Sequence, residues 1–220
     1  MQKRFLYVLL GSMMVFQGIM YFTEFANDHT IINFLILTVF APIMLTAAPS
    51  LYLVIHYSTS QKRLKSWQTA LHFAPAILFS SLFVLGLGAV YYNEMLLELI
   101  GHILRKSVVI LAILFVIQCI IYIVLATLRI MTFRTKAKSQ KKYKIVTKYV
   151  IQLTLLFTVF VLITSSLEIP YFEGSQLPNT ILNTVILALM IFVENEKNLA
   201  ESKLKVAEFE AKIEALKKSK

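Results

Sequence analysis

The sequence predicts an all-α, multi-pass membrane protein: a bundle of about six transmembrane helices, followed by a cytoplasmic, coiled-coil-like helix that continues from the last span. Three observations carry this prediction. Apolar residues make up 58% of the 220 residues, charged residues only 15%, and the mean hydropathy is +0.72. The apolar residues gather in runs of the length that crosses a bilayer as a helix. The basic residues gather in alternate gaps between these runs. A soluble domain of this size could not expose so much apolar surface.

The candidate spans are 5–22, 31–55, 69–91, 107–130, 147–167 and 179–194. The first run follows Lys3 and Arg4 but has no small-residue cleavage site, so we expect a retained span and not a cleaved signal peptide. The long second run contains Pro42 and Pro49, which predict a kink and leave open whether it forms one span or two short ones.

The charges between the runs predict the orientation. Basic residues precede the first run and fill the gaps 62–65 and 129–148. The alternate gaps hold the acidic residues Glu24, Asp28, Glu94, Glu98, Glu168 and Glu173, with Arg105 and Lys106. By the positive-inside rule both termini are cytoplasmic, and we expect the chain in a bacterial inner membrane. The net charge of +10 therefore reflects topology and contact with anionic lipid, and we expect no nucleic-acid binding by this chain itself.

Residues 180–220 predict one unbroken helix that leaves the membrane, because neither Gly nor Pro interrupts them. We divide the chain into a transmembrane bundle, 1–194, and a cytoplasmic helix, 195–220. The apolar residues of the outer half follow positions a and d of a coiled coil and predict the seam of a homodimer: Leu199, Val206, Phe209, Ile213 and Leu216. Glu and Lys residues, Glu194 and Lys197 among them, fill the other faces. A lone solvated amphipathic helix is the alternative.

Few residues are candidates for chemistry. Glu94, Glu98 and His102 recur four apart in 91–106, which predicts a short amphipathic helix on the outer membrane surface. This face could hold a divalent metal or sense pH, or it could simply be solvated. His72 lies near the cytoplasmic end of the third run, where a polar group needs a partner; a functional role and a merely hydrogen-bonded role both remain open.

The sequence contains no recognisable enzyme motif. Cys119 is the only cysteine, which excludes a disulfide framework and a cysteine-based metal site. Motifs for nucleotide binding, for a serine nucleophile and for zinc proteases are absent. We therefore expect no enzymatic activity and no cofactor.

Two segments resemble known families. Residues 49–78 combine Pro-x-Leu-Tyr-Leu, a basic gap and Leu-His-Phe-x-Pro, and resemble the membrane-embedded sensor portion of bacterial membrane-anchored AraC-type regulators. Residues 194–220 are similar to the Glu/Lys-rich linker helix of LytS-like sensor histidine kinases. Neither family's output domain occurs in residues 1–220, so neither DNA binding nor kinase activity is implied for any residue here.

The resemblance implies a sensory and dimerisation module. Its partners would be the lipid bilayer, a second copy of the chain and a cytoplasmic signalling protein. A small membrane transporter or an accessory subunit of a membrane complex is the alternative, and a membrane-embedded enzyme is the third and weakest.

Overall fold

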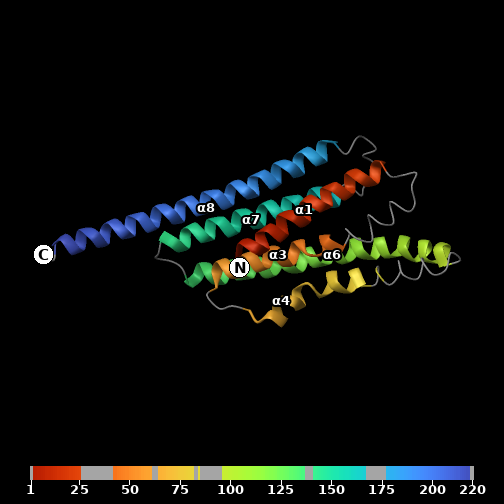
Figure 1. Cartoon of the computed structure of the whole chain (residues 1–220), viewed down its shortest axis with the longest axis horizontal. Coiled ribbons are helices and arrows are strands. Elements are labelled where there is room, and N and C mark those ends of the chain that lie inside the picture. Colours follow the sequence, from red (N-terminus) through yellow and green to blue (C-terminus); the bar gives the residue numbers. More distant parts are fainter. Residues whose placement is uncertain are drawn as a thin grey trace.

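The structure is a computed structural model (Figure 1) that describes residues 2–25, 42–60, 64–81, 84, 96–136, 141–166 and 177–218. Within these ranges the side chains are described except at 16, 19–25, 96–112, 134–136, 141–142, 165–166, 177–179 and 218. All regular structure in these ranges is helical, which confirms the all-α prediction for the described part of the chain.

The main helices are α1 (Gln2–Phe25), α3 (Ala47–Thr59), α4 (Ser66–His72), α6 (Leu96–Lys136), α7 (Lys141–Ser166) and α8 (Leu177–Lys218). They pack as a ring in which α1 contacts α3 and α8, α3 contacts α6, α6 contacts α7, and α7 contacts α8. Helix α3 also contacts α7 and is buried over most of its length. Most of the largest fully buried side chains come from α1, α3, α7 and α8, for example Leu9, Met13, Leu51, Leu53, Tyr149, Phe157, Phe160 and Met190.

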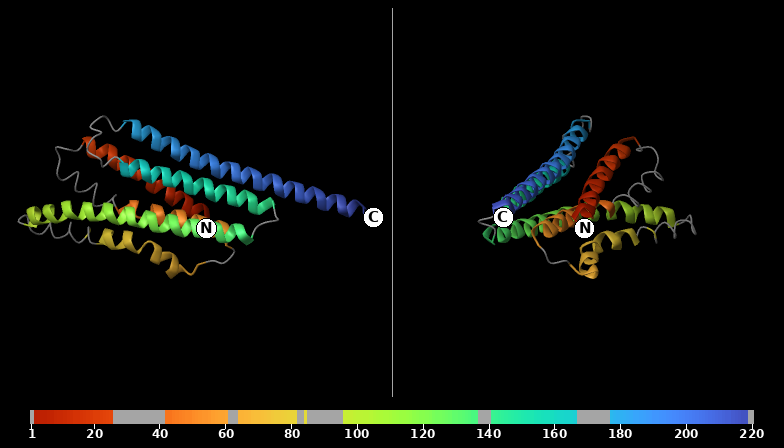
Figure 2. Two further views of the ribbon diagram at one scale, coloured as in Figure 1. Left: turned by 180° about the vertical axis from the view of Figure 1, so that it is seen from behind. Right: turned by 60° about the vertical axis from the view of Figure 1, so that its left-hand side comes forward.

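Successive helices alternate in direction, as Figures 1 and 2 show. The N-terminus, the C-terminal ends of α3 and α6 and the N-terminal ends of α4 and α7 therefore gather at one end of the bundle. Helix α8 projects beyond the other helices at this same end. The exposed basic residues of the predicted cytoplasmic gaps lie here: Lys3, Arg4, Lys65, Lys144 and Lys148.

The outside of the bundle is apolar. Large hydrophobic side chains are exposed along α6, α7 and α8, for example Ile120, Leu128, Leu162, Ile181 and Phe192. Among the residues that the structure describes, two stretches are long and apolar enough to cross a membrane, Ile113–Phe133 in α6 and Tyr143–Thr164 in α7. Soluble monomers rarely expose contiguous apolar surface on this scale.

Prolines shape the second and third apolar runs. In the second run the helix is interrupted by a turn at Leu45 and Thr46, and α3 starts only at Ala47. Pro49 then falls in the first turn of α3, where a missing N–H costs no helical hydrogen bond. In the third run α4 ends at His72, and helical structure resumes at residues 74–81. Pro75 explains this break, because it offers no N–H to the carbonyl four residues earlier.

Helix α6 corrects one prediction. Residues 96–106 belong to a continuous helix of 41 residues, so a separate amphipathic helix ending before the fourth span is wrong for these residues. No proline occurs between 96 and 136, and nothing in the sequence ends the helix at residue 106. At 1.5 Å per residue the helix is about 60 Å long, roughly twice the thickness of the hydrocarbon core.

Candidate functional site

Helix α8 leaves the bundle at a short segment around Glu194 and Lys197. As predicted, the helix is unbroken, with 42 residues from Leu177 to Lys218. Its buried face up to this segment follows helical spacing and rests on α7 and α1. From residue 205 to 217, every side chain is exposed. The segment is thus the junction between the packed half and the projecting half of one helix.

A buried ion pair occupies this junction. Glu194 and Lys197 are only 8% and 7% exposed, and the Lys197 Nζ lies 3.6 Å from the Glu194 Oε1. The Asn198 amide donates to the same oxygen at 3.2 Å. The Lys197 ammonium also lies 4.6 Å from the centre of the Tyr149 ring on α7, a cation–π distance. Removing either charge would leave its partner buried and unpaired.

The pair belongs to a polar cluster that joins three helices. The Tyr149 hydroxyl interacts electrostatically with Glu194 on α8 and with Gln2 on α1. None of these contacts has standard hydrogen-bond geometry, and the Tyr149 hydroxyl, the Glu194 Oε2 and the Gln2 Nε2 are all buried without a hydrogen bond. We call Gln2, Tyr149, Glu194 and Lys197 the junction cluster. A small displacement of α8 relative to α1 and α7 would allow these atoms to form hydrogen bonds.

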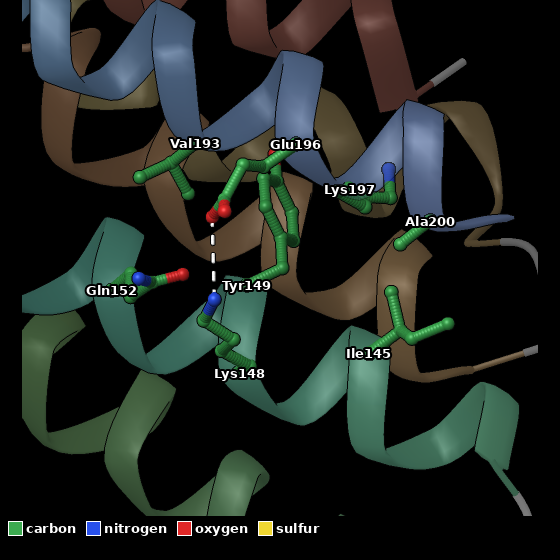
Figure 3. A pocket seen from close by; sticks show the side chains of 8 residues that line it. All are labelled: Ile145, Lys148, Tyr149, Gln152, Val193, Glu196, Lys197 and Ala200. Carbon is green, nitrogen blue, oxygen red and sulfur yellow. Dashed lines mark hydrogen bonds and ion pairs between the residues drawn. The ribbon is translucent and has the colours of Figure 1, made fainter.

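A pocket of about 100 Å³ lies beside the junction cluster, between α7 and α8 (Figure 3). Ile145 and Gln152 line it from α7, and Val193 and Ala200 line it from α8. Across it the Lys148 Nζ lies 3.3 Å from the Glu196 Oε2, in an ion pair whose side chains are 63% and 43% exposed. The pocket is smaller than the usual sites for organic ligands. We therefore interpret it as a gap in the helix contact and not as a ligand site.

His72 lies in a second polar group, formed by α3, α4 and α6. Its Nδ1 is 2.9 Å from the Tyr122 hydroxyl on α6. The Tyr52 ring of α3 lies 5.3 Å from the His72 ring and 5.8 Å from the Tyr122 ring, centre to centre. His72 thereby has the hydrogen-bond partner that a polar group near a membrane requires.

The remaining predicted site residues are those of the acidic face in 91–106 and of the dimer seam. Glu94 lies outside the described residues, and Glu98 and His102 lie in α6 with side chains outside the described set. Among the side chains that the structure describes, no group of three or more His, Cys, Asp or Glu residues could hold a metal ion. All five predicted seam residues are exposed, from Ile213 at 39% to Leu216 at 67%.

Two junction residues were not anticipated by the sequence pattern. Glu194 and Lys197 lie outside the predicted seam, as expected, but both are buried because they lie on the face of α8 that packs in the bundle. The other buried positions of this face are Asn183, Ile186, Leu187, Met190 and Val193. Glu194 and Lys197 continue their spacing of three and four residues. That spacing, extended past the last apolar residue, is the sequence signal that could have found the pair.

No protein-family model, curated protein or solved structure matches this chain.

Proposed function

We propose that this chain is the sensory and dimerisation module of a bacterial signal-transduction system. It is embedded in the inner membrane by six spans, with both termini in the cytoplasm. The alternating helix directions, the apolar outer surface and the basic residues at one end of the bundle support this topology. An accessory subunit of a membrane complex is the second candidate, because the projecting helix could dock on a different protein.

The observation that carries the proposal is the form of α8. One continuous helix packs in the bundle through its first half and projects beyond it with an exposed apolar stripe in its second half. Each large apolar side chain left in water costs about 1.5–3 kcal/mol relative to a buried one. Pairing two copies along the stripe buries all of these side chains at once, and the β-branched Val206 and Ile213 at position a favour two strands.

The junction cluster supplies the coupling. A stimulus that shifts α8 against α1 or α7 changes the contacts of Tyr149 and Gln2 with the buried Glu194–Lys197 pair. Because α8 is unbroken, a tilt or rotation at the junction reaches the projecting seam directly. The partner that reads this movement is a cytoplasmic signalling protein.

The topology makes a first prediction. Reporter fusions after Lys65, after Lys141 and at Lys220 are expected to read cytoplasmic, since the basic gaps stay inside. Fusions after Asp28, Glu98 and Glu173 are expected to read external. Activity of paired phosphatase and fluorescent-protein reporters measures each location, and a cytoplasmic reading at Glu98 would contradict the six-span arrangement.

The dimer seam makes the second prediction, tested by cysteine cross-linking in membranes. The background carries Cys119→Ala, which removes the native thiol. This thiol is buried in the bundle. Single cysteines at the seam positions 206, 209, 213 and 216 are expected to form cross-linked dimers on oxidation. Matched cysteines at 205, 208 and 212, outside positions a and d of the same helix, are expected to cross-link far less.

The pattern of cross-links separates the alternatives. Equal cross-linking at all seven positions, or none at any, would contradict the homodimer seam. If the seam positions instead cross-link to a different protein, and the cross-linked product has the same size each time, the accessory-subunit function replaces the proposed sensory function.

A further inference from the structure

A second groove, of about 240 Å³, lies between α1 and α8 on the other side of the junction cluster. Its inner part is apolar, lined by Leu6, Leu10 and Ile191. Its outer part is polar, lined by Lys3, Asn195 and Asn198. On both helices the polar residues are the ones nearer the end of the bundle where α8 projects. The groove therefore changes from apolar to polar along its length, and it does so in the same direction on α1 and on α8.

The charge available in the groove is positive. Lys3 is exposed and forms no ion pair with any residue that the structure describes. Glu194 also lines the groove, but its Oε1 is paired with Lys197 at 3.6 Å and accepts from Asn198 at 3.2 Å, and its Oε2 is buried. Asn195 is exposed and offers an amide donor in the same groove as Lys3. An anion with an apolar tail has complementary chemistry to this arrangement.

We propose that this groove binds one anionic phospholipid of the cytoplasmic leaflet. Its phosphate contacts the Lys3 ammonium and the Asn195 amide, and the start of an acyl chain lies along Leu6, Leu10 and Ile191. The volume admits only part of a lipid, so the chains continue over the apolar outer surface, where Val8 and Ile191 are exposed. The inference rests on the proposed membrane topology, which puts this end of the bundle at the cytoplasmic headgroups.

Such a lipid would bridge α1 and α8 next to the junction cluster. It would add a contact between these two helices to the one that they already make directly. The anionic lipid content of the membrane would thereby bias the position of α8, which is the element proposed to carry the signal.

The test compares two neighbouring basic residues of equal charge. Lys3 lines the groove, whereas Arg4 is exposed and does not line it. The full chain is reconstituted in phosphatidylcholine vesicles with or without phosphatidylglycerol, extracted in mild detergent and analysed by native mass spectrometry for bound lipid. We expect the wild type and Arg4→Gln to retain one phosphatidylglycerol. Lys3→Gln should lower its retention about fivefold, the effect of losing one cation at an anionic lipid.

A second variant tests the amide without changing the charge. Asn195→Leu is expected to lower phosphatidylglycerol retention as well, and to leave thermal unfolding unchanged because Asn195 is exposed. Excess inorganic phosphate is expected not to displace the lipid, since the ion lacks the apolar part; displacement would show a plain phosphate site and overturn the lipid proposal.

The remaining outcomes also decide the question. Equal losses for Lys3→Gln and Arg4→Gln would show unspecific surface attraction, and equal retention of phosphatidylcholine would show an apolar groove without headgroup selection. Either result overturns the proposal. Cross-linking of the seam cysteines is measured in the same vesicles, so that loss of the lipid site with an intact seam is distinguished from failure of the proposed function.

Discussion

Lys197→Met is expected to destabilise the folded protein by about 3 kcal/mol, the cost of leaving one charge of a buried pair without its partner. Lys197 and Glu194 are 7% and 8% exposed, so water does little to replace the lost ammonium. The Asn198 amide remains on the Glu194 carboxylate but carries no full charge. Met keeps most of the volume of the Lys side chain, so the loss reports the charge and its contact with the Tyr149 ring. Unfolding in mixed detergent micelles measures the change.

The neighbouring ion pair provides the matched control. Lys148 on α7 and Glu196 on α8 form an ion pair at 3.3 Å next to the junction cluster, but their side chains are 63% and 43% exposed. Lys148→Met is therefore expected to cost under about 1 kcal/mol, because solvent and salt screen an exposed pair. Equal losses of stability for Lys197→Met and Lys148→Met would contradict the argument that burial makes the Glu194–Lys197 pair the more costly one to break.

A double substitution separates the pair from the packing. In the double variant Glu194→Gln with Lys197→Met, no charge is left buried, and we expect most of the stability lost in Lys197→Met to return. If the double variant is as unstable as the sum of its single variants, the two side chains act independently and the cluster cannot serve as a coupled element.

The second large effect is expected at the seam. Replacing Phe209 and Ile213 together with Glu is expected to raise the dimer dissociation constant at least about a hundredfold. Both positions lose an apolar side chain in each copy, and carboxylates of the two copies then meet in the seam as like charges. Energy transfer between labelled copies in vesicles measures the dissociation.

A control places the same charges on the opposite face of the helix. Ala207 and Ala211 are exposed and lie outside positions a and d. Ala207→Glu with Ala211→Glu is expected to leave the dimer intact, while circular dichroism checks that the helix content of both double variants is unchanged. If the seam variant altered neither assembly nor stability, the projecting half of α8 would be a passive solvated helix.

The sequence alone determined the helical class and the continuity of α8. Dense apolar runs cannot form a soluble surface, and the absence of Gly and Pro from 180–220 leaves nothing to end a helix there. It also indicated the exposed stripe from Leu199 to Leu216, because heptad spacing is a property of one helix. These features are local or follow from composition.

Only the tertiary structure decided how far along α8 the buried face extends past the last apolar residue. Glu194 and Lys197 have the same sequence neighbourhood as the exposed Glu196 and Lys203, and their burial depends on where α7 and α1 pack against α8. The partner of His72 likewise comes from Tyr122, fifty residues away on another helix. Contacts between helices depend on how the helices are rotated and shifted relative to one another. The residue pattern of one helix cannot specify this, because the partner residues lie far away in the chain.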